Sequence, residues 1–298
     1  MNEQPATAGV AAQSRDRARC QELRLVLDAA GIPSETVFDD GWWLLLVRSE
    51  DLTRARAELR AYRDENPTRE PLPKPPLPRY EGGWPGVLGY AAVLLLVAFL
   101  AGNYVFSADW FAVGRVQAGL VMAGEWWRPI TALTLHGDAG HLAANLVFGG
   151  LFGGLAALAV GGGVAWLTIA LGGILGNALN ALIQSPSHAS IGASTAVFAA
   201  LGLLVAHAVR NRQHLPSSPL RRWSPVVGGV LLLAYTGTGG ERTDVMAHLT
   251  GFLAGAAVGW PVTGLPAAML GERRVQSAAG ALALGLLVLG WVVGLAAA

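Results

Sequence analysis

The amino-acid sequence predicts an all-α polytopic membrane domain preceded by a small α+β domain. The chain has 298 residues, of which 53% are hydrophobic and only 14% are charged, whereas soluble domains usually carry about 25% charged residues. The charge is also unevenly distributed. Of the 41 Asp, Glu, Lys and Arg residues, 26 lie within residues 1–81 and 15 lie in the remaining 217. The large apolar part of the chain therefore requires lipid as its solvent.

Residues 1–70 are expected to form the small α+β domain, on the cytosolic side of the membrane. Leu23, Val26 and Leu27 fall on one face of a helical pattern, which is typical of an amphipathic helix. The dipeptide Asp40-Gly41 is a hairpin-type turn between two strand-like runs. No catalytic pattern is visible here, so we expect a regulatory or anchoring role. The expected elements are a helix at 15–31, strands at 35–38 and 42–47, and a helix at 50–65.

The domain boundary is predicted at residues 71–85, where five prolines within ten residues favour a stiff, extended linker. Residues 86–298 then contain apolar stretches of the length needed to cross a bilayer, about twenty residues each. These spans must be helical, because only a helix satisfies its own backbone polar groups within lipid. We expect seven spans, at 86–106, 141–160, 162–183, 192–209, 225–240, 244–262 and 277–296.

Basic residues between the spans predict the orientation. Arginines cluster in two of the predicted loops, and the positive-inside rule places such loops in the cytoplasm. With seven spans, the N-terminal domain lies on the same side as these loops and the C-terminus lies outside. We therefore expect a multi-pass protein of the cell membrane with a cytoplasmic N-terminus. The residues concerned are Arg210, Arg212, Arg221, Arg222, Arg273 and Arg274.

Several classes of partner and cofactor are not expected. The net charge of +1 gives no reason to expect nucleic acid as a partner. The single cysteine, Cys20, provides neither a disulfide framework nor a cysteine-based metal site. No zinc spacing such as H-E-x-x-H is present. The sequence therefore predicts no metal and no cofactor, and the lipid bilayer is its expected environment.

Four polar residues stand out within the predicted spans, where polar side chains are costly and usually functional. They are His141, Asn145, Ser194 and His248. In the predicted topology each lies near the outer end of its span, so all four can share one depth. His141 and Asn145 are four residues apart and therefore project from one helical face. Both can donate hydrogen bonds, as an oxyanion hole requires.

Ser194 and His248 suit nucleophilic catalysis. Ser194 begins the fourth span, where a helix N-terminus offers free N–H groups to a developing oxyanion, and Gly192 leaves room for a substrate backbone. A serine hydroxyl needs a base, which is usually histidine. The alternatives are a small serine at a helix start and a structural buried histidine. His248 also shares a helical face with three glycines that favour close packing, Gly251, Gly255 and Gly259.

Taken in order, these residues resemble the rhomboid family of intramembrane proteases. The resemblance covers roughly Gly86 to Pro261 and implies a six-helix rhomboid-like core, here with one additional C-terminal transmembrane helix. It rests on Glu125-Trp126-Trp127-Arg128, His136, His141-(x)3-Asn145, Gly192-Ala193-Ser194 and Ala247-His248-(x)2-Gly251-(x)3-Gly255.

The resemblance also implies roles for individual residues. Ser194 would attack the scissile carbonyl and His248 would transfer the proton, as a dyad without an acid. The oxyanion would be stabilised by His141, Asn145 and the backbone N–H of Ser194. The substrates would be transmembrane proteins, cleaved at an active site near the outer face. Supporting roles fall to Gly192, to Phe198 against the imidazole, and to the structural loop residues Trp127 and Arg128.

One departure from the family pattern keeps a second interpretation open. Thr195 stands where the family usually has the last glycine of Gly-x-Ser-Gly, and its bulk could narrow the pocket or reduce activity. The alternative is a catalytically inactive rhomboid-like pseudoprotease that binds membrane-protein clients. A transporter would predict internal repeats or broken helices, which the sequence does not show. Asn177 and Asn180 are expected to form hydrogen bonds between helices, His136 to support the outer loop, and His188 to be solvated.

Overall fold

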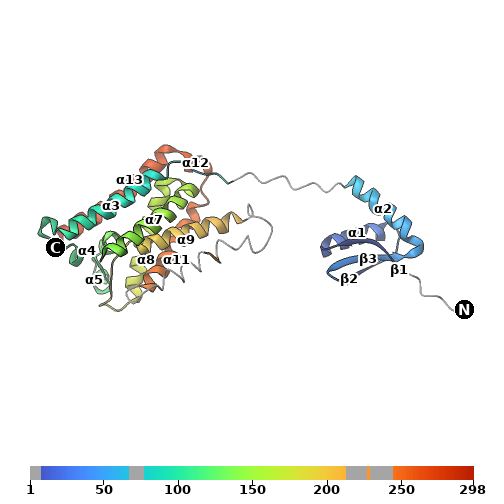
Figure 1. The fold of residues 1–298 in the computed structure, drawn as a ribbon, viewed down its shortest axis with the longest axis horizontal. Helices are drawn as coiled ribbons and strands as arrows, with labels where there is room; N and C mark the ends of the chain where they lie inside the picture. Colours follow the sequence, from blue (N-terminus) through green and yellow to red (C-terminus); the bar gives the residue numbers. More distant parts are fainter. Residues whose placement is uncertain (1–7, 67–76, 213–226, 229–243) are drawn as a thin grey trace. The chain divides into compact units, whose positions relative to one another are not determined.

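The computed structural model describes residues 8–66, 77–212, 227–228 and 244–298 (Figure 1). The chain divides into two compact units, Met1–Lys74 and Pro75–Ala298. Each unit has its own elements and its own core, and each is described by itself.

The first unit is a three-stranded antiparallel sheet with two helices. Its sheet has the order β1-β3-β2, and its core contains the α1 residues Cys20, Leu23 and Leu27, with Val26 partly buried beside them. The predicted amphipathic face is therefore the face that packs. The elements are β1 (Ala8–Ser14), α1 (Arg17–Ala29), β2 (Ser34–Asp39), β3 (Trp42–Arg48) and α2 (Leu52–Glu65).

Strand β1 was not among the expected elements. It pairs antiparallel with β3, from Ala8 opposite Arg48 to Ser14 opposite Trp43, and its register shifts between Val10 and Ala12. Its sequence, AGVAAQS, is mostly small and contains one β-branched residue, so it lacks the usual composition of a strand. The pairing with β3 decides its conformation.

The second unit is a bundle of long apolar helices, and the structure bears out the helical membrane domain that the sequence predicts. Five described helices are long and apolar enough to cross a membrane, and α9 is a shorter apolar helix. The predicted span at 225–240 lies outside the described residues except for 227–228. The helices are α3 (Trp84–Gly102), α7 (Ala139–Val160), α8 (Gly162–Ile183), α9 (Ser194–Arg210), α11 (Val245–Val262) and α13 (Arg273–Ala296).

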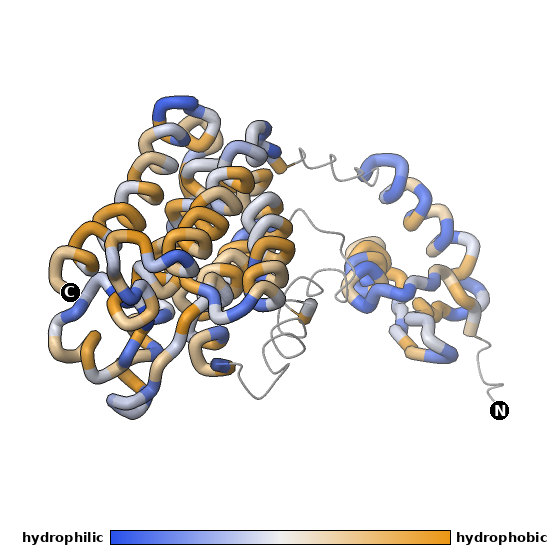
Figure 2. Tube along the Cα trace, turned by 60° about the vertical axis from the view of Figure 1, so that its left-hand side comes forward, coloured by the Kyte–Doolittle hydropathy of each residue, from blue (hydrophilic) through white to orange (hydrophobic). Residues whose placement is uncertain are grey.

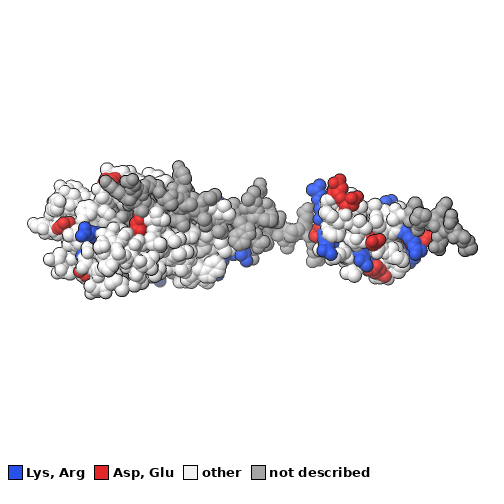
Figure 3. Space-filling view, turned by 90° about the horizontal axis from the view of Figure 1, so that it is seen from below, with Lys and Arg blue, Asp and Glu red and all other residues white. Residues whose placement is uncertain are grey.

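Hydropathy distinguishes the two units. Hydrophobic residues run along the helices of the second unit, whereas the first unit alternates between hydrophilic and hydrophobic residues (Figure 2). Acidic and basic side chains crowd the first unit, while they are sparse among the described residues on the visible face of the second (Figure 3). A surface of this kind suits lipid, in which a charged side chain near the centre of a helix is costly. The chain is a multi-pass membrane protein.

The centre of the bundle consists of α8, α9 and α11, which contact one another closely, while α3 packs on α7 and α13 packs on α8. Helices α7, α9 and α11 begin at the same end of the bundle, and α8, which runs in the opposite direction, ends there (Figure 1). We call this the site end of the bundle, since His141, Ser194 and His248 all lie in the first turns of their helices.

The segment between α3 and α7 is folded rather than extended. It contains the short helices α4 (Trp110–Gly114), α5 (Ala118–Met122) and α6 (Arg128–Thr131), followed by a 3-10 turn at Ala132–Thr134. A two-residue strand, β4 (Val116–Gln117), pairs antiparallel with β5 (Ala189–Ser190) just before α9. This pairing, unexpected in a domain predicted to be all-α, ties the segment to the loop that leads to Ser194.

Candidate active site

Ser194 is the first residue of α9, and the loop before it is held in a conformation that suits glycine. Gly192 has φ +127°, a backbone region that side chains rarely adopt, and its N–H donates to the carbonyl of Ala132 at 2.9 Å. A Cβ atom at position 192 would lie 2.7 Å from Nε2 of His141 and 3.7 Å from Oγ of Ser194. Only glycine lets the imidazole of His141 approach the serine loop this closely.

His248 lies in the first turn of α11 and is 7% exposed. Its imidazole packs on the ring of Phe198, with the ring centroids 4.3 Å apart and the planes inclined by 33°. Phe198 lies four residues after Ser194 and therefore projects from the same face of α9, one turn further along. The aromatic contact thus places His248 beside the first turn of α9, where Ser194 lies.

The close approach of α9 and α11 depends on glycine. A Cβ atom at Gly251 would clash with the carbonyl oxygen of Thr195, and one at Gly255 would clash with that of Ala199. At Gly259 the added atom would lie 3.0 Å from Cα of Leu203. The three glycines predicted to favour close packing therefore form the contact between the two helices, which fixes His248 relative to Ser194.

His141 and Asn145 lie on the first turns of α7. The carboxylate of Asp138 accepts a hydrogen bond from the backbone N–H of His141 at 2.8 Å, which caps the helix. Asn145 is 5% exposed, its Nδ2 donates to the carbonyl of His141 at 3.1 Å, and Tyr90 donates to the Asn145 carbonyl at 2.8 Å. These bonds fix the first turns of α7, from which both side chains line the site cavity.

One cavity of about 1000 Å³ brings these groups together. Its lining includes Ser194, His248, His141 and Asn145, the four polar residues singled out in the sequence, and also Gly192, Phe198, His188 and Asp244. Among the described residues, no group of three or more His, Cys, Asp or Glu side chains is placed to hold a metal ion. The arrangement offers a hydroxyl, an imidazole and hydrogen-bond donors around one space, which suits acyl transfer.

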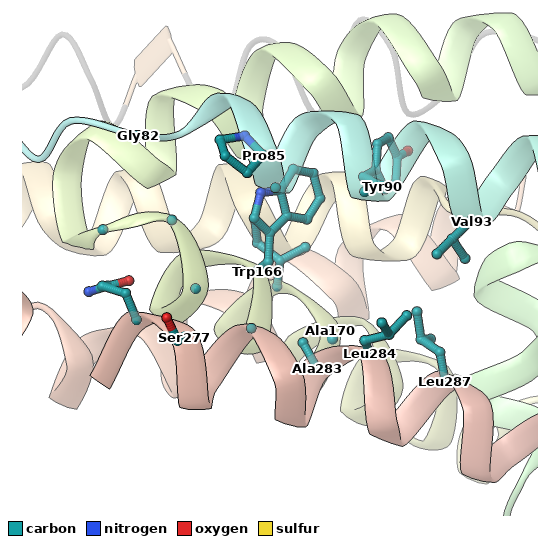
Figure 4. A pocket seen from close by; sticks show the side chains of 18 of the residues that line it. Gly82, Pro85, Tyr90, Val93, Trp166, Ala170, Ser277, Ala283, Leu284 and Leu287 are labelled. Carbon is teal, nitrogen blue, oxygen red and sulfur yellow. The ribbon is translucent and has the colours of Figure 1, made fainter. Parts of the chain in front are cut away.

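A second cavity of similar size, about 830 Å³, lies elsewhere in the bundle. It is a groove between α3 and α13 with α8 behind it, and Trp166 of α8 points towards α3 between Pro85 and Tyr90 (Figure 4). The Trp166 ring stacks on Tyr90 with centroids 4.9 Å apart. Its described lining includes Ser277 but no histidine. The residues that line the first cavity, rather than its size, therefore identify it as the candidate active site.

Trp127 and Arg128, which the family resemblance gives a structural role, lie in the folded segment before α7. The guanidinium of Arg128 is buried, pairs with Glu125 at 2.6 Å, and donates to the carbonyls of Ala112 and Arg115 at 2.9 Å. The indole of Trp127 donates to the carbonyl of Val113 at 3.3 Å. Neither residue lines the site cavity as described, so their contacts hold the segment together.

His136 contacts the serine loop. Its Nε2 accepts a hydrogen bond from the backbone N–H of Ala193 at 3.5 Å. Burial first, and then the neighbouring His141 ring, lower the pKa of His136 to about 4, against smaller raising effects from Thr134 and from Asp138. A neutral imidazole has the free lone pair that this contact requires.

His188 is not simply solvated, contrary to the expectation from the sequence. Its Nε2 lies 2.7 Å from Oδ2 of Asp244, and Asn180 donates to the same oxygen at 2.8 Å. Asn180 thus forms the predicted bond between helices. Asn177 also forms a hydrogen bond outside its own helix, and donates to the carbonyl of Pro129 at 3.0 Å.

We did not identify Asp244 as a residue of the site from the sequence. A helix-capping pattern could have indicated it, since an aspartate directly before the apolar run of α11 is a typical helix N-cap. Burial would raise the pKa of Asp244, but hydrogen bonds from the backbone N–H of Ala247, from His188 and from Asn180 outweigh it and lower the pKa.

Thr195, the departure from the family pattern, directs its bulk into a helix contact. It is 3% exposed. Its methyl carbon lies 2.8 Å from a Cβ built at Gly176 of α8 and 2.9 Å from one built at Gly251 of α11. The methyl group therefore fills the space that these two glycines leave between three helices.

Comparison with known proteins matches the same part of the chain. A family model described as the rhomboid domain covers residues 123–264. The chain is 30% identical over 183 residues to Rhomboid protease GluP of Bacillus subtilis (strain 168), covering 59% of this chain and 35% of that protein. It is 35% identical over 146 residues to Rhomboid-like protease 3 of Toxoplasma gondii, covering 49% of this chain and 55% of that protein.

A plant relative gives a similar match. The chain is 27% identical over 162 residues to Rhomboid-like protein 11, chloroplastic, of Arabidopsis thaliana, covering 51% of this chain and 58% of that protein. The chain thus spans between about a third and somewhat more than half of the length of these relatives. The matched domain, the apolar helices and the order of the site residues agree, and the chain belongs to the rhomboid family.

Proposed function

We propose that this protein is an intramembrane serine endopeptidase that cleaves transmembrane-segment substrates with a Ser194–His248 dyad. The observation that carries the proposal is the packing of the His248 imidazole on Phe198, one helical turn from Ser194. Support also comes from the relatives whose names identify them as rhomboid proteases.

In the proposed reaction, the Ser194 hydroxyl attacks the scissile carbonyl carbon while His248 accepts its proton. The C–N bond then breaks as the imidazolium returns that proton to the leaving amine, and an acyl-enzyme remains. His248 next removes a proton from water, the resulting hydroxide attacks the ester, and Ser194 recovers its proton as the product acid leaves. The same histidine therefore serves both half-reactions.

The tetrahedral intermediate requires hydrogen-bond donors directed at its oxyanion. The backbone N–H of Ser194, at the start of α9, is supported by the positive end of the helix. The imidazole of His141 lies beside Gly192, near the Ser194 hydroxyl, and Asn145 lines the same cavity one turn further along α7. We assign His141 and Asn145 to oxyanion binding, with Gly192 providing the close approach.

We further propose that the N-terminal unit lies in the cytoplasm and that the site end of the bundle faces outside. The clustered arginines support this orientation by the positive-inside rule. Polar groups lining the site cavity suit entry of the water that the second half-reaction consumes. Substrate helices would reach the site laterally and unwind locally to expose the bond.

The alternative is a pseudoprotease that binds membrane-protein clients without cleaving them. It is favoured by Thr195 at a position where the family usually has glycine. Against it, the methyl group of Thr195 faces Gly176 and Gly251, so this methyl group lies in a helix contact, although the residue also lines the site cavity.

The test is cleavage of a fluorogenic transmembrane peptide by the protein in liposomes, compared with Ser194→Ala and His248→Ala. The proposal expects cleavage by the wild type and a loss of at least about a thousandfold in both variants, since removing either member of a dyad abolishes the shared step. Binding of the peptide without cleavage by the folded wild type would favour the pseudoprotease.

A further inference from the structure

A polar cluster at the site end joins three parts of the chain. Its side chains take no part in the proposed reaction. Asn180 comes from the end of α8, His188 from the loop between α8 and α9, and Asp244 from the position just before α11. Oδ2 of Asp244 lies 2.7 Å from Nε2 of His188 and 2.8 Å from Nδ2 of Asn180. Fifty-six positions separate His188 from Asp244, so the contact is a feature of the fold.

The two carboxylate oxygens of Asp244 have different partners. Oδ1 accepts the backbone N–H of Ala247 at 3.0 Å and thereby caps α11, while Oδ2 accepts from His188 and Asn180. An ionised carboxylate only accepts hydrogen bonds, so Nε2 of His188 must carry the proton that faces it. Helix capping and the contact between elements are therefore separable functions of one side chain.

The loop that contains His188 is anchored on its other side as well. The carbonyl of His188 accepts the N–H of Ala118 at 3.0 Å, and the carbonyl of Pro186 accepts that of Gly119 at 2.9 Å. The next residues form β5, which pairs with β4. With its backbone fixed to the segment before α7, the loop holds the His188 side chain at one position, six residues before Ser194.

We propose that His188 and Asp244 are positioning residues that hold the first turn of α11, and with it His248, in register with the loop that carries Ser194. This inference rests on the proposed function for its effect on catalysis. His248 lies one helical turn after Asp244, so a shift of the capping residue moves the imidazole. The side chains are 25% and 16% exposed, which shields the contact from competing water.

Asp244→Asn separates the two functions of the carboxylate. Asparagine is as good an N-cap as aspartate, so Oδ1 still caps α11, but its Nδ2 then faces the two donors His188 and Asn180. The matched control is Asp109→Asn, because Asp109 also caps a helix through Oδ1, with bonds of 3.1 and 3.0 Å to Phe111 and Ala112, outside the site cavity.

The first readout is the rate at which a fluorophosphonate probe labels Ser194 in proteoliposomes. We expect Asp244→Asn and His188→Ala each to slow labelling about tenfold, the effect of one lost coupling between contacting residues. His188→Gln, whose amide can still donate to Oδ2, should recover most of the rate, and Asp109→Asn should label like the wild type. With a peptide substrate, kcat should fall while KM stays unchanged, because the contact orients the base rather than the substrate.

The second readout does not depend on activity. Thermal unfolding of His188→Ala, Asp244→Asn and the double variant forms a double-mutant cycle, in which the double variant should lose no more stability than Asp244→Asn alone. Additive losses, or normal labelling by both single variants, would overturn the inference. A folded wild type that fails to label would contradict the proposed function instead, while the unfolding cycle would still decide whether the contact couples the two elements.

Discussion

Phe198 and His248 lie ring against ring, with centroids 4.3 Å apart, although they come from different helices and are fifty positions apart in the chain. The contact is possible because α11 presents glycines to α9 along their whole interface. Small residues thus set the distance between the helices, and one aromatic pair sets the orientation of the base.

The first prediction concerns Phe198. Replacing it by alanine removes the surface against which the imidazole packs, so Phe198→Ala should lower kcat for peptide cleavage about tenfold or more. The aromatic contact is worth about 0.5–1.5 kcal/mol beyond burial, and the change also leaves a cavity costing about 3–5 kcal/mol of stability. Phe198→Tyr keeps the ring and should retain more activity than Phe198→Leu. Equal activity in these two variants would argue against an orienting role for the ring.

The second prediction concerns the contact of α9 with α11. Gly255→Ala places a methyl group against the carbonyl oxygen of Ala199, so the helices must separate, at a cost of about 1–3 kcal/mol or more. The melting temperature and the cleavage rate should both fall. Gly285→Ala on α13 is the matched control, because nothing lies within 4 Å of the added atom, and its stability should stay the same or rise. Equal effects at the two positions would contradict the close-packing account.

The third prediction concerns Gly192. Gly192→Ala adds backbone strain at φ +127° and also a Cβ 2.7 Å from the His141 ring. Cleavage should fall at least about tenfold, because displacing one oxyanion donor costs about 2.7–4 kcal/mol in other serine hydrolases. Gly124→Ala is the control for strain alone, since Gly124 has φ +108° with open space around it. If both variants lose activity equally, strain rather than the displacement of His141 is responsible.

The fourth prediction concerns pH. The pKa of His136 is lowered to about 4 by burial, whereas an unfolded histidine titrates near 6.5. Between pH 6.5 and pH 4, His136 binds a proton in the unfolded chain but stays neutral in the folded chain. The free energy of unfolding should therefore fall as the pH drops from 6.5 towards 4. The loss is about 3 kcal/mol when complete. The slope of melting temperature against pH should flatten in His136→Gln, and an unchanged slope in that variant would contradict this assignment.

The sequence predicts the helical membrane domain correctly, for physical reasons. A long apolar stretch can only be helical in lipid, so the bounds of α7 and α8 follow closely from hydropathy. The family pattern places Ser194, His248, His141 and Asn145 in order along the chain, and the structure gathers all four around one cavity. Their chemical roles stay proposals that the experiments above address.

The features that the sequence did not predict depend on contacts between distant residues. Strand β1 exists because β3 is there to pair with it, since its own small residues do not favour a strand. The sequence places His188 in a loop and gives no sign of a partner, because Asp244, which it contacts, lies 56 positions away at the start of α11. The effect of Thr195 likewise depends on Gly176, a residue of α8 that its position in the chain does not reveal.

The nucleophile is tested most directly by labelling the membrane-embedded protein with a fluorophosphonate probe and locating the adduct by mass spectrometry. The proposed dyad predicts a single adduct on Ser194 in the wild type and none in Ser194→Ala. His248→Ala should label at least about a thousandfold more slowly, because the hydroxyl then lacks its base. A folded wild type that does not label, or that labels equally well without His248, would contradict a catalytic dyad.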